Sequence, residues 1–134
     1  MRPPPRAAGE RGSAVVDFVL VVLVLVPLVL GILQVALTLF VRNTLAAAAS
    51  EGARYAATAD RGPADGVART RQQVDGAVSG SFARDVTATR VVRDGQPMIE
   101  VTVRARVPAL GLGGPGVDLV VTAHAVEEDT EVAP

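Results

Sequence analysis

Residues 18–41 read FVLVVLVLVPLVLGILQVALTLFV and contain no charged side chain, and they are bounded by Asp17 and Arg42. As an α-helix this segment would be about 36 Å long at about 1.5 Å per residue, which exceeds the roughly 30 Å hydrocarbon core of a bilayer. Valine and leucine dominate its first half. Valine is β-branched and a weak helix former in water, but lipid leaves the backbone no partner outside its own helix. The sequence therefore predicts a transmembrane helix.

Two residues interrupt the aliphatic run. Pro27 removes one helical hydrogen bond and predicts a kink, and Gly31 offers a place where another helix could approach closely. Both residues are also tolerated in ordinary transmembrane helices, so the sequence leaves the two interpretations open.

Arginine placement predicts the orientation of this helix. Arg2, Arg6 and Arg11 precede the segment, whereas Arg42 and Arg54 follow it within a similar distance. Positive residues favour the cytoplasmic side. We therefore expect a single-pass protein of the cell membrane, with a cytoplasmic N-terminus and an extracytoplasmic C-terminal module.

A cleaved secretory signal is the alternative to a permanent anchor. Residues 46–49 are alanines followed by Ser50, which provides the small-residue pattern that signal peptidase reads. The apolar core of such a signal is about 7–15 residues, however, and this one is far longer. Cleavage near residue 50 would release a small secreted binding module.

The composition disfavours several other functions. The 134 residues carry 13 basic and 14 acidic side chains, with no cysteine and one histidine, His124. This balance disfavours a nucleic-acid-binding surface, and the chain lacks the residues for a disulfide, a thiolate site or a zinc cluster. A hydrolase would depend on Ser50, Ser79 or Ser81 with His124, and nothing in the sequence supports that pairing. We expect no enzyme activity, no cofactor, no metal and no small-molecule substrate.

The sequence before the apolar segment places an acid at its entrance. Asp17 lies five positions after Gly12, which itself follows Arg11. An ionised side chain costs about 2.5–3.5 kcal/mol at the centre of a membrane helix and less near the interface, so it usually has a partner. Asp17 could instead mark the water boundary or act as a favourable charge in the first helical turn.

This arrangement resembles the processing site of type IV prepilins, in which a short basic leader, a glycine, four mostly apolar residues, an acid and an aromatic residue precede a long apolar helix. The resemblance implies that a membrane-embedded prepilin peptidase cleaves after Gly12 and that Ser13 becomes the first residue. It further implies that Asp17, beside Phe18, pairs with the new N-terminus of a neighbouring subunit.

A narrower resemblance extends over more of the chain. The opening residues 10–18, the segment with Pro27 and Gly31, and residues 49–57 (ASEGARYAA) are similar to the TadE-like family. Asp17 stands where that family more usually has glutamate. Membership implies a pilin-like protein, or pseudopilin, that takes part in the assembly of a tight-adherence pilus or a related secretion system. The implied partners are membrane lipid, other tight-adherence proteins and a prepilin peptidase.

Helical character continues beyond the apolar segment. Residues 43–59 are rich in alanine, which predicts one helix over about residues 14–58. Small residues recur every four positions along it, which could let another helix or a sheet pack closely, although the helix could equally stand alone. These small residues are Ala48, Gly52 and Ala56, and Ala49, Ala53 and Ala57. The sequence Asp60-Arg61-Gly62-Pro63 should end the helix, with Gly62 at its C-terminus.

The rest of the chain predicts a short helix and a small sheet. A polar helix is expected over residues 64–78, and apolar residues then alternate over residues 98–107 and 117–126, with a weaker strand at 86–93. Asp94-Gly95 is a strong hairpin signal. The predicted fold is α+β and pilin-like, with a three-stranded antiparallel sheet laid against the exported helix. Its expected divisions are a basic leader at 1–12, the transmembrane and continuing helix at 13–59, and an exported module at 60–134.

Three further features of the module are not expected to form functional sites. Residues 108–116 are rich in glycine, but no Lys, Ser or Thr follows and the next element is a strand, so we expect a flexible loop and not a phosphate site. Leu110 and Leu112 in this loop could contact a partner or the bilayer surface. His124 is expected to be solvated on the outer face of its strand. The acidic end, with Glu127, Glu128, Asp129 and Glu131, is expected to be a frayed tail.

Overall fold

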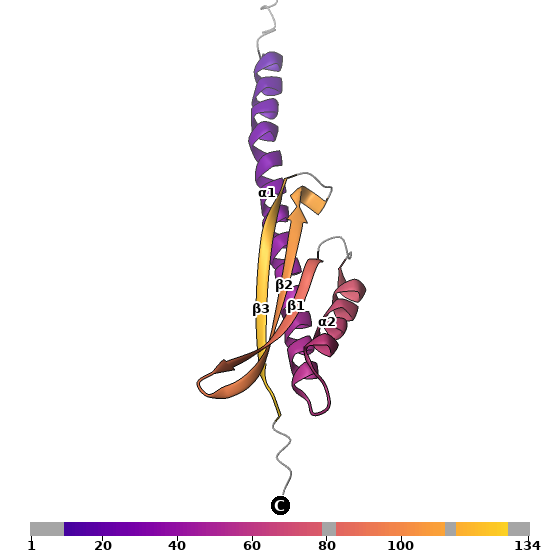
Figure 1. Cartoon of the computed structure of the whole chain (residues 1–134). Coiled ribbons are helices and arrows are strands. Elements are labelled where there is room, and N and C mark those ends of the chain that lie inside the picture. Colours follow the sequence, from indigo (N-terminus) through magenta and orange to yellow (C-terminus); the bar gives the residue numbers. More distant parts are fainter. Residues whose placement is uncertain (1–9, 79–82, 112–114, 129–134) are drawn as a thin grey trace, which may run out of the picture. The chain divides into compact units, whose positions relative to one another are not determined.

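The computed structural model describes residues 10–78, 83–111 and 115–128. The chain divides into two compact units, residues 1–35 and residues 36–134, which are described separately. The elements are α1 (Glu10–Ala57), α2 (Pro63–Ala77), β1 (Ala83–Arg93), β2 (Gln96–Pro108), the 3-10 turn η1 (Ala109–Gly111) and β3 (Gly116–Val126), as Figure 1 shows.

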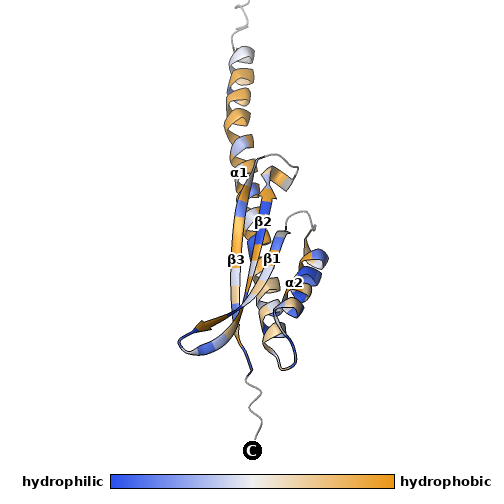
Figure 2. Ribbon diagram, viewed as in Figure 1, coloured by the Kyte–Doolittle hydropathy of each residue, from blue (hydrophilic) through white to orange (hydrophobic). Residues whose placement is uncertain are grey.

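The first unit contributes the N-terminal part of α1. The predicted long helix is confirmed, although it begins at Glu10 instead of residue 14. Gly12 and Ser13 are therefore helical. Pro27 lies inside the helix, and Figure 2 shows that apolar residues dominate this part of the ribbon.

The second unit begins at residue 36 and contains the C-terminal part of α1, the helix α2 and the sheet. The α+β prediction with a three-stranded antiparallel sheet is confirmed, and the strand order is β1-β2-β3. Each strand extends the predicted range by one to three residues at an end. Of the strands, β1 is the one that α2 contacts most, and Figure 1 shows α2 beside it.

The hairpin between β1 and β2 is tight. Arg93 pairs with Gln96, and the two residues between them have positive φ angles, 52° at Asp94 and 79° at Gly95. Two successive left-handed residues define a type I′ turn, whose twist matches that of the flanking strands. The Asp-Gly pair therefore fixes the register of β1 on β2, as the sequence predicted.

The connection between α1 and α2 corrects one expectation. Gly62 does not end α1, because its φ of −154° is extended and its amide donates a hydrogen bond to the Asp65 carboxylate at 2.9 Å. It caps the N-terminus of α2, and Pro63 occupies the first helical position, where a missing N–H costs nothing. Asp60 provides the left-handed residue after α1, with a φ of 67°. Aspartate tolerates this conformation better than most residues.

The core of the second unit lies between α1 and the inner face of the sheet. β2 buries every second residue against α1, and Val74 of α2 and Val121 of β3 belong to the same core. The largest fully buried side chains are Val41, Leu45, Val74, Ile99, Val101, Val103 and Val107. The alternation expected for β2 is thereby confirmed.

The start of the acidic C-terminus is ordered by the fold, contrary to the prediction of a frayed tail. Glu127 accepts a hydrogen bond from Arg90 at 2.9 Å, and its amide donates to the carbonyl of Pro97. The amide of Glu128 donates to the carbonyl of Ala57 at 2.9 Å. These contacts fix the end of β3 beside the end of α1. Asp129 and Glu131 lie outside the described residues.

The hairpin gives a first testable prediction. Gly95→Ala should lower the free energy of unfolding by about 1–2 kcal/mol, because a Cβ is disfavoured at positive φ. Urea unfolding of the detergent-solubilised chain, followed by circular dichroism, measures the change. Gly95→Asn should cost less, since asparagine tolerates the left-handed region. Equal effects of the two substitutions would contradict the turn assignment.

Candidate functional site

The first unit presents an almost continuous apolar surface. Side chains on every face of α1 between residues 15 and 35 are exposed within the chain, including Phe18, Leu23 and Ile32. The helix is long enough and apolar enough to cross a membrane. A helix that is apolar all round is stable only when another apolar medium or protein surrounds it.

The predicted processing and pairing residues lie together near the start of this helix. Gly12 and Ser13 belong to its first turns, and a Cβ at Gly12 would meet no atom within 4 Å. Asp17 and Phe18 are exposed one turn later. Asp17 forms no ion pair with another residue of the described chain, so its carboxylate is available to a group from outside.

Pro27 and Gly31 also lie on the exposed surface of the helix. Pro27 and Gly31 line a shallow apolar depression together with Leu28, Ile32 and Val35. A Cβ at Gly31 would have no neighbour within 4 Å, so nothing in this unit requires a glycine there.

In the second unit, the small residues of α1 lie where α2 crosses it. A Cβ added to Gly52 would lie 1.9 Å from Oγ1 of Thr70 and 2.8 Å from the carbonyl oxygen of Gly66. A Cβ added to Gly66 would in turn lie 2.8 Å from the Cβ of Ala56. The two backbones approach each other too closely for any larger side chain, so glycine is required in both helices.

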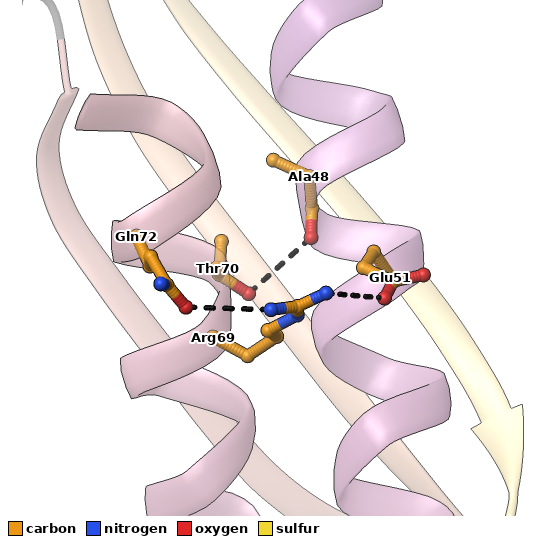
Figure 3. A network of polar contacts seen from close by, with 5 residues as sticks. All are labelled: Ala48, Glu51, Arg69, Thr70 and Gln72. Carbon is orange, nitrogen blue, oxygen red and sulfur yellow. Dashed lines mark hydrogen bonds and ion pairs between the residues drawn. The ribbon is translucent and has the colours of Figure 1, made fainter. Parts of the chain in front are cut away.

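Both stripes of small residues on α1 are buried, on adjacent faces. Ala48, Gly52 and Ala56 lie under α2, where the hydroxyl of Thr70 donates to the carbonyl of Gly66 at 2.8 Å and lies 3.4 Å from that of Ala48 (Figure 3). Thr70 is itself fully buried, and these contacts satisfy its hydroxyl. The second stripe, Ala49, Ala53 and Ala57, is part of the apolar core that includes the sheet.

Polar contacts flank this helix crossing. Arg69 of α2 bonds the carboxylate of Glu51 of α1 at 3.2 Å and the side-chain oxygen of Gln72 at 3.3 Å (Figure 3). The guanidinium of Arg61 lies 3.7 Å from the centre of the Tyr55 ring. These groups are partly exposed, so they align the helices more than they stabilise them.

The outer face of the sheet carries a charged cluster that sequence reasoning missed. Nε2 of His124 lies 2.7 Å from Oε2 of Glu100, and Arg93 lies 3.6 Å from the same oxygen. The expectation of a solvated histidine is therefore wrong, because His124 is half-buried and has a carboxylate partner. Glu100 and His124 are register partners in β2 and β3, a pairing that the alternation alone could not reveal because the 108–116 connection leaves the register open.

Within residues 10–78, 83–111 and 115–128, no three His, Cys, Asp or Glu side chains gather into a possible metal site. Ser79 and Ser81 lie outside the described residues. The most extensive surface in need of an external partner is thus the apolar face of the first unit.

The comparison with protein families also points to the apolar helix of the first unit. Residues 12–54 match the family of TadE-like proteins, from Gly12 through the whole apolar segment to Arg54. The resemblance to the TadE-like family is confirmed. The TadE-like match ends within α1, so α2 and the sheet lie beyond it. No curated protein and no solved structure matches the chain.

The helix crossing leads to a second prediction. Gly52→Ala should destabilise the chain by about 2 kcal/mol or more, because the added methyl group must displace Thr70 and the α2 backbone. Gly76→Ala is the matched control, since a Cβ at Gly76 meets nothing within 4 Å. That control should be neutral or stabilising by up to about 1 kcal/mol. Equal stabilities of the two variants in urea would show that α2 does not pack closely on α1.

Proposed function

We propose that this chain is a membrane-anchored, pilin-like protein that takes part in the assembly of a tight-adherence-type pilus or a related secretion system. The observation that carries the proposal is the charge-free, exposed helix that lies within the TadE-like match. The helix anchors the protein in lipid, and the second unit is exported. The role is assembly and not catalysis, with no cofactor and no small-molecule substrate.

The position of Gly12 supports processing by a prepilin peptidase. Gly12 lies two residues after α1 begins, in the first turn, where the backbone amides have no intrahelical acceptor. Glycine also lowers helix stability by about 1 kcal/mol relative to alanine, so local unwinding at this peptide bond costs little. Cleavage there would remove the basic leader and leave Ser13 as the first residue.

Asp17 then supplies the group that would join one subunit to the next. A carboxylate at the entrance of an apolar segment is costly without a partner, and the described chain provides none. The new amine of a neighbouring subunit, beside Phe18, would neutralise it and set the stagger between the two helices. The proposed partners are other tight-adherence proteins. The arginines before the helix favour a cytoplasmic N-terminus.

The alternative, a module released by cleavage near residue 50, fits the second unit poorly. Cleavage there would remove Val41 and Leu45, two of the largest fully buried side chains, together with the buried Ala48 and Ala49. Each lost aliphatic side chain would leave a cavity that costs about 2–5 kcal/mol. Three strands are near the minimum for a stable sheet, so the released module would not be expected to stay folded.

Intact mass of the chain extracted from membranes tests anchoring and processing together. We expect a membrane-bound product that begins at Ser13, and a Gly12→Val variant that keeps its leader. A membrane-bound product that begins at Met1 would remove the processing step and leave the anchor. A soluble product that begins near Glu51 would overturn the proposal in favour of the secreted module.

Substitution of Asp17 tests the pairing role. Asp17→Asn should strongly reduce cross-linking of the chain to its assembly partners in membranes, because an amide cannot neutralise a buried amine. Its amount in the membrane fraction should not change. Asp17→Glu is the matched control and should keep the cross-links. Undiminished cross-linking of the Asn variant would exclude the pairing role.

A further inference from the structure

The sheet extends along α1 as far as the apolar segment. The bond from the Glu128 amide to the Ala57 carbonyl fixes the far end of β3 beside the end of α1. From there β3 runs back for 11 residues, or about 36 Å at about 3.3 Å per residue. The same length of α-helix contains about 24 residues. Counted back from Ala57, this length places the start of β3 within about one helical turn of residue 36, where the second unit begins.

Burial confirms this alignment. Val107, the register partner of Val117, is fully buried in the same core as Val41, and Leu37 packs against that core. Residues 37 and 41 belong to the charge-free stretch that ends at Val41. The module therefore covers one face of the last turn of the stretch that would otherwise be available to lipid.

The apolar length that remains is just enough for a bilayer. A helix from Phe18 to Ala36 rises about 28 Å, close to the roughly 30 Å of the hydrocarbon core. No spare helical turn is left to hold the module away from the membrane. The end of the second unit at residue 36 must therefore meet the headgroup region directly.

That end of the second unit presents exposed apolar side chains. Leu110 in η1 is 38% exposed and Val117 at the start of β3 is 46% exposed, while Phe40 on α1 is 58% exposed. Leu110 has a φ of 50°, a conformation that a leucine rarely adopts. From Val107 to Val117 the sequence has no charge, whereas Arg106 and Asp118, an ion pair 3.8 Å apart, flank it.

The opposite end of the unit is charged. The turn at Asp94 is flanked by the exposed Arg93, and the connection after α1 exposes Asp60 and Arg61. Val92 is also exposed at that end, so the two ends differ in the charge of their connections, and the uncharged connection is the one that a membrane surface would accept.

We propose that Leu110, Val117, Phe40 and its neighbour Leu39, which is 52% exposed, form a lipid-contact rim, by which the sheet rests on the membrane surface at the β2–β3 connection. The partner is the interface of the bilayer, where apolar side chains reach the upper acyl chains and arginines stay at the headgroups. This inference rests on the proposed membrane anchor and adds a second point of contact. The rim would limit tilting of the second unit relative to the membrane surface.

Single-tryptophan variants test the rim, because the chain contains no tryptophan. Leu110→Trp and Val117→Trp are placed in full-length protein reconstituted into phosphatidylcholine vesicles, with and without lipids brominated near the top of the acyl chain. Val92→Trp is the matched control, since Val92 is 72% exposed on β1 beside the hairpin at the other end. Leu25→Trp reports insertion of the anchor.

We expect the bromolipids to quench each rim tryptophan at least about twofold more strongly than Val92→Trp, because the interface suits tryptophan. Quenching of Leu25→Trp alone, with both rim variants as unquenched as Val92→Trp, would overturn the rim and leave the anchor standing. Absence of quenching at Leu25 as well would overturn the proposed function itself. Two rim positions are used so that misfolding of one variant, detected by circular dichroism, still leaves a measurement.

Discussion

The second unit depends on how closely the two helices approach each other at Gly52 and Gly66. Because neither position could carry a Cβ without a clash, α2 lies directly on the α1 backbone, and Thr70 is buried between them. The adjacent face of α1 is left to the sheet, which buries Val41, Leu45 and the second stripe of alanines. One helix thus provides packing surfaces for both of its neighbours, and its small residues make that possible.

Local patterns in the sequence predicted the helices, the strands and the first hairpin. The charge-free segment, the alternation in β2 and the Asp94-Gly95 pair each act over a few residues, and for that reason they can be recognised without tertiary information. The stripe Ala48, Gly52 and Ala56 could be recognised too, but whether α2 or the sheet would occupy it depended on chain contacts that no local pattern encodes.

Long-range pairings were missed for the same reason. The partnership of Glu100 with His124 requires the register of β2 on β3, and the contacts of Glu127 and Glu128 require the position of the end of α1. At the turn after α1, Gly62 was predicted to end the helix because glycine favours left-handed conformations. Asp60 takes that conformation instead, which frees Gly62 to begin α2 beside Pro63.

The bond between Glu128 and Ala57 has a consequence for biogenesis. It joins the end of β3 to the end of α1, and β3 is the last of the three strands in chain order, so the sheet is complete only after β3 has been made. During synthesis, the C-terminal part of α1 leaves the ribosome long before the strands that cover it. Its core-facing alanines and Val41 then stay uncovered until β3 has followed, and in this interval a chaperone could bind them.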